Sequence, residues 1–66
     1  MKMDMITRNA LLDSIEDTLG PQGDRDVSKM TVIGLAERYY GPTEDGKRFT
    51  EDAMGRLEKV WAIQDS

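Results

Sequence analysis

The sequence predicts a small, mainly α-helical domain of three helices. Three observations support this fold class: apolar residues recur at helical spacing, capping residues precede the periodic segments, and a glycine–proline pair ends each of the first two. At 66 residues the chain is long enough for a single domain, 1–66, and too short for two. A short β ribbon around residues 39–49 remains open as a variant of this fold.

The first helix is predicted in the segment TRNALLDSIEDTLG, residues 7–20. Its apolar residues share one helix face: Leu11, Leu12, Ile15 and Leu19. Thr7 is the expected N-cap, with Asp4 as an alternative that starts the helix one turn earlier. Gly20 and Pro21 end it, because glycine tolerates a left-handed cap and proline cannot continue a helix.

The second helix is predicted from about residue 28 to 40, with Asp26 or Ser28 as its cap. The best apolar stripe along it contains Met30, Ile33, Ala36 and Tyr40. The β-branched stretch TVIG, residues 31–34, also fits a short strand, so helix and strand both stay open there. Gly41 and Pro42 end the segment.

The third helix is predicted in FTEDAMGRLEKVWAIQ, residues 49–64, with Thr50 as N-cap. Two acids follow the cap, where the positive end of the helix dipole favours them. Before this helix, Asp45–Gly46 is a dipeptide typical of hairpin turns, so Tyr39–Tyr40 and Arg48–Phe49 are the candidate strands of the ribbon. One core cluster is expected to join the first and third helices: Leu12, Ile15, Leu19, Leu57, Val60 and Trp61.

The residue types that most catalysis requires are missing. The chain contains neither histidine nor cysteine, which removes the commonest general base, the commonest metal ligand and thiolate chemistry. Asp13, Glu16 and Asp17 share a helix face, but a chain of this size hardly encloses a cleft that would raise a carboxyl pKa, so a solvated face is the simpler interpretation. We therefore expect no enzyme activity, no cofactor and no metal.

The charge balance points to a protein partner. Thirteen acidic residues against nine basic ones give a net charge of −4, which disfavours direct nucleic-acid binding and favours a larger protein with a basic, nucleic-acid-binding surface. No apolar run is long enough to span a membrane, and the first residues lack the apolar stretch of a signal peptide. A cytoplasmic protein, with a monomer favoured, is the expectation.

The candidate partner-binding residues are the clustered acids. Residues 13–26 contain five acidic residues and one basic residue, Arg25. A second group of acidic residues follows the second predicted helix. The full set is Asp13, Glu16, Asp17, Asp24, Asp26, Glu44 and Asp45. Solubility alone is the competing explanation, because net charges of about 2–8 are ordinary for small domains.

Residues 45–61, DGKRFTEDAMGRLEKVW, resemble the wing and following helix of winged-helix regulators. In those proteins an Asp-Gly turn leads through an aromatic strand to a helix that starts at threonine. The resemblance covers about a quarter of the chain, and no basic recognition helix precedes it. It implies, as an alternative function, a small transcription regulator or an antitoxin with a winged-helix-like C-terminal half.

In its small size, its acidity and its lack of catalytic residues, the chain also resembles the small phage proteins known as anti-CRISPR proteins. Several members of that class are similar to DNA in surface charge and occupy a nucleic-acid site on a Cas effector. The resemblance implies a small acidic protein-binding inhibitor that mimics nucleic acid and blocks DNA binding by a Cas effector complex. It carries no shared motif, so it assigns no site residues.

Overall fold

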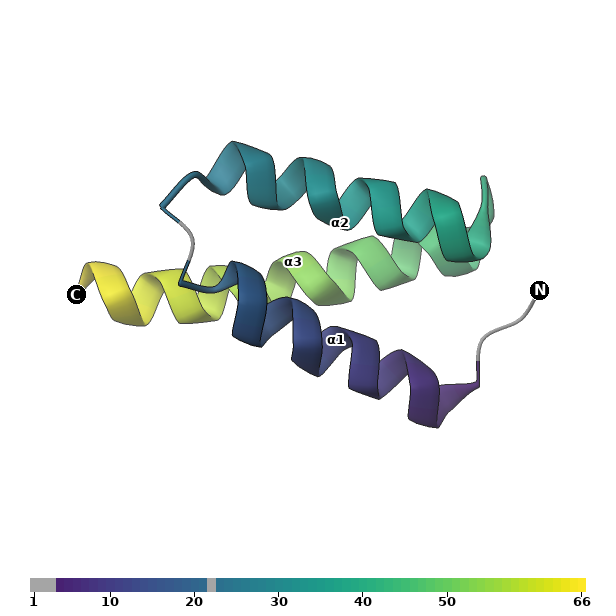
Figure 1. Ribbon diagram of the computed structural model, residues 1–66, viewed down its shortest axis with the longest axis horizontal. Coiled ribbons are helices and arrows are strands. Elements are labelled where there is room, and N and C mark those ends of the chain that lie inside the picture. Colours follow the sequence, from purple (N-terminus) through teal and green to yellow (C-terminus); the bar gives the residue numbers. More distant parts are fainter. Residues whose placement is uncertain (1–3, 22) are drawn as a thin grey trace.

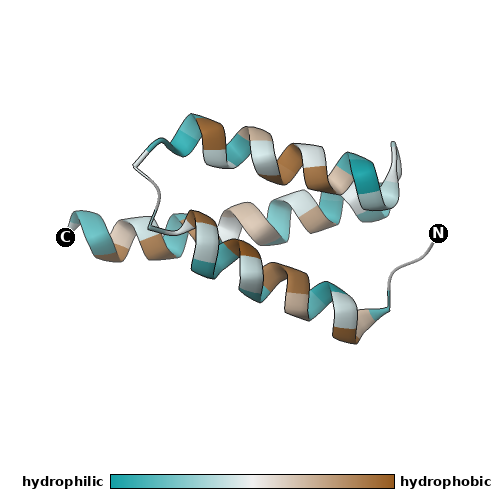
Figure 2. Ribbon diagram, viewed as in Figure 1, coloured by the Kyte–Doolittle hydropathy of each residue, from teal (hydrophilic) through white to brown (hydrophobic). Residues whose placement is uncertain are grey.

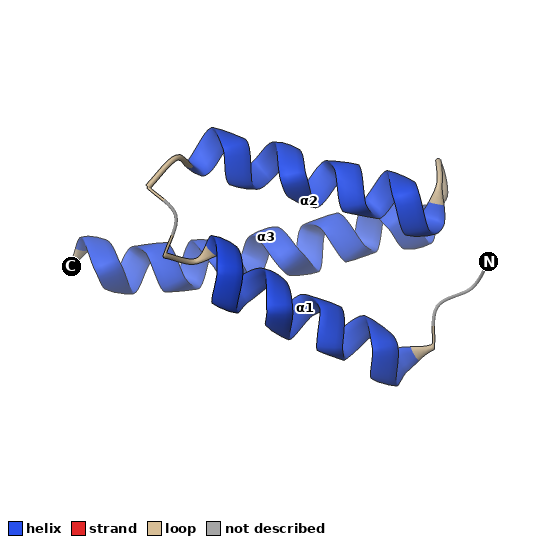
Figure 3. Cartoon of the chain, in the orientation of Figure 1, coloured by secondary structure: helices blue, strands red, loops and turns tan. Residues whose placement is uncertain are grey.

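A computed structural model describes residues 4–21 and 23–66. It contains three helices: α1 (Met5–Leu19), α2 (Arg25–Tyr40) and α3 (Glu44–Asp65) (Figure 1). Within those residue ranges there is no strand (Figure 3). The three-helix prediction is confirmed, and the β ribbon that the sequence left open around residues 39–49 does not form in the described part of the chain. None of the three helices has the length and apolar character that crossing a membrane requires.

The longest helix, α3, is the centre of the fold. Both α1 and α2 pack against α3, whereas α1 and α2 make few contacts with each other. The first helix runs parallel to α3 and the second runs antiparallel to it (Figure 1). Hydrophobic residues recur along α1 and α2 rather than collecting in one segment (Figure 2), as expected where each helix packs through a single face.

The core forms where the faces of α1 and α2 meet α3. Phe49, Leu57 and Val32 are fully buried at its centre. Of the six residues that the sequence assigned to one cluster, five are buried in it: Leu12, Ile15, Leu19, Leu57 and Trp61. The sixth, Val60, is half-buried. The contribution of α2 to the core was not predicted.

Asp4, the alternative cap, is the N-cap of α1, and its carboxylate accepts a 2.7 Å hydrogen bond from the backbone N–H of Thr7. This bond lowers the pKa of Asp4, because it favours the charged carboxylate. At the other end, Gly20 has φ −55°, so the predicted left-handed cap is wrong. The chain continues in right-handed geometry as far as Gly20 before it turns away.

The second helix begins earlier than predicted, because Asp24 serves as its N-cap in place of Asp26 or Ser28. The stretch TVIG is helical, which resolves the helix–strand alternative. The buried stripe is Ser28, Val32 and Ala36, while Met30 is 70% exposed. The predicted stripe is therefore right for Ala36, which is buried, and for Tyr40, which packs against the core, and it is wrong for Met30.

The buried stripe of α2 consists of residues smaller than those predicted for it. Ser28 is fully buried, and its hydroxyl donates a 3.3 Å hydrogen bond to the backbone carbonyl of Asp24. This bond offsets much of the cost of burying the hydroxyl. Small side chains let two helix backbones approach, so the exact rotation of α2 depends on its fit against α3 and not on hydrophobicity alone.

A tight connection stands where the sequence left a β ribbon open. Gly41 ends α2 with φ +65°, a conformation that glycine adopts without steric cost. Two residues later Thr43 caps α3, and its hydroxyl accepts a 3.2 Å hydrogen bond from the backbone N–H of Gly46. Glu44 and Asp45 then occupy the first helical turn, where the helix dipole stabilises them. The Asp45–Gly46 pair is therefore helical and makes no hairpin.

The winged-helix resemblance fails for the same reason, since residues 45–61 all lie within α3. Thr50, the predicted cap, lies inside this helix and donates a 3.0 Å hydrogen bond to the carbonyl of Gly46. Phe49 is part of the helix as well, and its ring lies 5.4 Å from that of Tyr40. Burial of Phe49 against α2 favours the extra helical turns over an isolated ribbon, which would be weak alone.

Candidate functional site

Three of the predicted acids lie at one end of the fold, where α1 ends and α2 begins. Asp17 is in the last turn of α1, Asp24 caps α2 and Asp26 occupies its first turn. The C-terminal end of α3 reaches the same end of the molecule and brings Asp65 (Figure 1). We call these four exposed carboxylates, Asp17, Asp24, Asp26 and Asp65, the acidic end.

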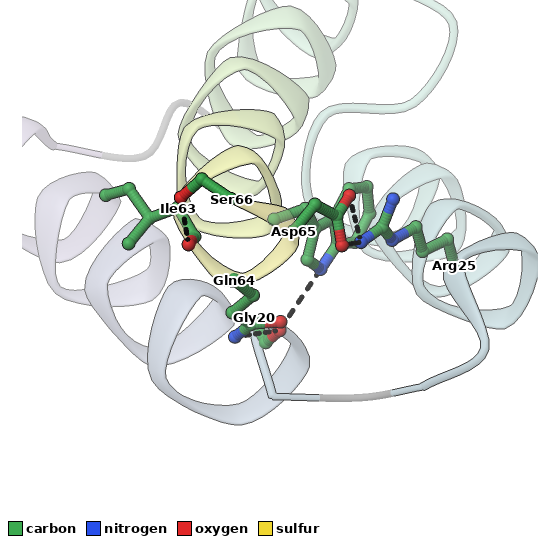
Figure 4. A network of polar contacts seen from close by, with 7 residues as sticks. Gly20, Arg25, Ile63, Gln64, Asp65 and Ser66 are labelled. Atoms are coloured by element: carbon green, nitrogen blue, oxygen red, sulfur yellow. Dashed lines mark hydrogen bonds and ion pairs between the residues drawn. The ribbon is translucent and has the colours of Figure 1, made fainter.

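The single arginine at the acidic end is already engaged. Both carboxylate oxygens of Asp65 accept hydrogen bonds from Arg25 Nη2, at 2.7 and 2.8 Å (Figure 4). The guanidinium also lies over the Trp61 ring, 5.1 Å from its centroid. The hydrogen bond from Arg25 lowers the pKa of Asp65, and the same bond raises the pKa of Arg25.

The position of this end relative to α3 is fixed by the Gly20 carbonyl. Trp61 Nε1 and Gln64 Nε2 each donate a 3.1 Å hydrogen bond to it (Figure 4). A carbonyl has two lone pairs, so one oxygen accepts both bonds. A helix leaves its last carbonyls without intrahelical partners, and here side chains from α3 fill that role.

Asp13 and Glu16 were also predicted as partner-binding residues. Each forms an intramolecular ion pair with the same arginine. Arg56 of α3 contacts both, with Nη2 2.5 Å from Asp13 Oδ1 and 3.2 Å from Glu16 Oε2. The hydrogen bond to Asp13 is the main cause of a raised pKa of Arg56. These two acids therefore link α1 to α3, and their charge is partly balanced.

Glu44 and Asp45, the last two predicted acids, lie at the opposite end of the molecule in the first turn of α3. Glu44 Oε1 lies 3.9 Å from Lys47 Nζ, and both side chains are mostly exposed. The structure therefore places three of the seven predicted acids at the acidic end, Asp17, Asp24 and Asp26. Asp13 and Glu16 lie beside Asp17 on α1 but pair with Arg56, whereas Glu44 and Asp45 lie at the other end of the molecule.

Two features of the charged surface were missed in the sequence. Arg8 of α1 pairs with Asp52 of α3, and Asp65 joins the acidic end from a distant part of the chain. The Arg8–Asp52, Asp13–Arg56 and Gly20–Trp61 contacts join residues 44, 43 and 41 positions apart. This near-constant separation reflects the parallel packing of α1 and α3, which no local pattern in the sequence reveals.

Among the described residues, no group of three or more acidic side chains is placed to hold a metal ion. Every buried side-chain polar atom in that part of the chain has a hydrogen-bond partner. Comparison with protein-family models, with curated proteins and with solved structures found no match. The physical character of the surface is therefore the basis for a functional proposal.

Proposed function

We propose that this protein acts by binding rather than by catalysis, as a small acidic inhibitor that covers a basic, nucleic-acid-binding surface of a larger protein. The resemblance to anti-CRISPR proteins makes a CRISPR effector complex the proposed target, whose DNA-binding surface the carboxylates would occupy in place of phosphates. The observation that carries the proposal is the acidic end.

The electrostatics of the acidic end support this proposal. Four carboxylates stand against one guanidinium, which leaves three negative charges, and Asp65 already binds that guanidinium. The next cation along α2, Lys29, lies one turn further from the end. The C-terminal ends of α1 and α3 add partial negative charge at this end, and the N-terminal end of α2 offsets part of it with partial positive charge.

A surface of this kind increases the rate of association with a basic partner, because Coulomb attraction steers the encounter. Individual exposed ion pairs contribute only about 0.2–1 kcal/mol. Specific inhibition would therefore need several carboxylates to act together, and the acidic end provides them on adjoining helix ends that contacts with α3 hold in place.

The test uses purified CRISPR effector complexes of several types and a labelled target DNA duplex in a mobility-shift assay. We expect the protein to leave the free duplex unshifted and to prevent at least one effector from binding it. Added salt should weaken the inhibition by screening. A direct shift of the duplex would instead favour a DNA-binding regulator.

A charge variant locates the contact. Asp17→Lys with Asp26→Asn changes the net charge by +3 at the acidic end, where neither residue has an ion-pair partner among the described residues. The matched control, Asn9→Lys with Glu58→Lys, makes the same change at exposed positions on other parts of α1 and α3. The first variant should lose inhibition and the second should keep it, with both folded by circular dichroism. Equal inhibition by all three proteins would refute the acidic-end proposal.

A further inference from the structure

A groove of about 590 Å³ lies where the second half of α2 meets the first half of α3. Ile33 and Ala36 line it from α2, Pro42 from the connecting turn, and Gly46 and Thr50 from α3. Its volume lies within the range of pockets that bind small molecules or side chains. The groove is open to solvent and is remote from the acidic end, on the part of α3 that follows the turn.

The first helix leaves this groove uncovered. α1 contacts α3 through Asp52 and Arg56, whereas Lys47 and Glu51 line the groove. Successive residues of a helix point about 100° apart, so Glu51 and Asp52 face different sides of α3. The α2–α3 pair thus has α1 on one side and an open groove on another.

Apolar surface continues from the groove along α2. Met30 precedes Ile33 by three residues, which places the two on the same helix face. Met30 is 70% exposed, and Ile33 is only half-buried. Both residues belong to the apolar stripe predicted along this helix, which also contains Ala36 and Tyr40. Since α3 covers the Ser28–Val32–Ala36 face instead, Met30 and Ile33 remain available to another molecule.

The rims of the groove are acidic. Glu37 on α2 and Glu51 on α3 are exposed, and in the described part of the chain neither has a cation within ion-pair distance. The lining contains a single cation, Lys47, which already lies 3.9 Å from Glu44. A partner that placed positive charge beside both glutamates would gain from each contact, whereas a second copy of this chain would bring Glu37 and Glu51 toward their own equivalents.

We infer that the groove binds an amphipathic helix of a partner protein, with an apolar side chain seated over Ile33 and Ala36 and Lys or Arg residues beside Glu37 and Glu51. Helix-in-groove binding of this type uses apolar anchors at helical spacing on the partner. A flexible methionine at the edge of such a groove adapts to the shape of the anchor. This inference does not depend on the proposed function, because it concerns a different surface.

The probe is a synthetic, fluorescein-labelled helical peptide with leucines on one face and lysines on the flanks. Two companion peptides replace either the lysines by glutamates or the leucines by serines. Fluorescence anisotropy should show binding of the leucine–lysine peptide alone. Backbone amide NMR shifts should change most at Ile33, Gly46 and Thr50 and little at the acidic end. Largest changes at residues 17–26 would overturn the inference.

Matched variants test the charge requirement. Glu37→Lys with Glu51→Lys should weaken peptide binding about tenfold, since two favourable pairs become repulsive. The control, Asp17→Lys with Glu58→Lys, makes the same change of charge away from the groove. Its affinity for the peptide should stay within about twofold of that of the unmodified chain. Equal weakening by both variants would show attraction to net charge only and would refute the groove. Analytical ultracentrifugation completes the test, because a dimer with amide shifts in the groove would identify a second copy as the occupant and overturn the inference.

Discussion

The indole Nε1 of Trp61 donates a 3.1 Å hydrogen bond to the backbone carbonyl of Gly20, which joins α3 to the C-terminal end of α1. Trp61 is only 6% exposed, and the guanidinium of Arg25 of α2 lies over its ring. One side chain thus contacts parts of all three helices. Trp61 therefore helps to orient the acidic end, together with the Asp65–Arg25 ion pair.

Truncation of Trp61 should strongly destabilise the fold. We expect Trp61→Ala to lower the free energy of unfolding by about 3–5 kcal/mol, as for other buried aromatic residues. Trp61→Phe keeps most of the buried apolar surface, so it should lower the free energy of unfolding by less. About 1 kcal/mol of this smaller loss should come from the missing hydrogen bond to Gly20. Urea unfolding followed by circular dichroism compares the two. A Trp61→Ala protein as stable as the unmodified chain would contradict this packing.

The start of α3 can be tested at two threonines. Thr43 is the N-cap, so Thr43→Ala should lower the free energy of unfolding by about 1 kcal/mol. Thr50 lies inside the helix, where alanine is the better helix former, so Thr50→Ala should change stability by less than about 0.5 kcal/mol. Thermal unfolding of both variants distinguishes the two starting points. A larger loss at Thr50 than at Thr43 would favour the shorter helix that the sequence suggested.

The glycines differ in what an added methyl group would meet. At Gly20 a Cβ would clash with the backbone carbonyl oxygen of Glu16 and would lie 3.1 Å from Val60 Cγ1 of α3, so Gly20→Ala should be destabilising by about 1–3 kcal/mol through overpacking. At Gly34, an exposed helical position, no neighbouring atom lies within 4 Å. Gly34→Ala should therefore stabilise the protein by about 0.5–1 kcal/mol. In chemical denaturation the free energy of unfolding should fall for Gly20→Ala and rise for Gly34→Ala. A stabilising Gly20→Ala would contradict the crowding of Gly20 by Glu16 and Val60.

The Arg25–Asp65 ion pair should make the free energy of unfolding decrease at acid pH. The hydrogen bond from Arg25 lowers the pKa of Asp65 below its usual 3.8. A lowered carboxyl pKa in the folded state stabilises the protein above the pKa of the unfolded chain, and this contribution is lost as pH falls through the lower, folded value. The loss is therefore confined to pH below about 4.

An NMR titration of the Asp65 carboxylate checks that expectation. The midpoint should lie below 3.8 in the unmodified protein and should rise toward the ordinary aspartate value in Arg25→Gln. Arg8→Gln serves as the control, because Arg8 pairs with Asp52 on another part of α3. Arg25→Gln should raise the pKa of Asp65, and Arg8→Gln should leave it unchanged. An unchanged midpoint in Arg25→Gln would show that the ion pair does not cause the lowered pKa of Asp65.

The sequence by itself determined the fold class, the core faces of the first and third helices and the ends of the first two. Leu12, Ile15, Leu19, Leu57 and Trp61 lie in the core as predicted, because helical periodicity is a local property that the chain carries without reference to its neighbours. The alternative cap at Asp4 and the end of α2 at Gly41 follow from equally local chemistry.

Tertiary packing decided the rest. The sequence predicted a turn before Phe49, whereas residues 44–49 are helical and Phe49 is buried and packs against Tyr40 of α2. The rotation of α2 buries Ser28 and exposes Met30, since small residues fit the surface of α3. The parallel pairing of α1 with α3 places Asp13 and Glu16 beside Arg56, and Asp65 joins Asp17, Asp24 and Asp26 at one end. Contacts between residues some forty positions apart depend on how the helices associate, and no local pattern encodes them.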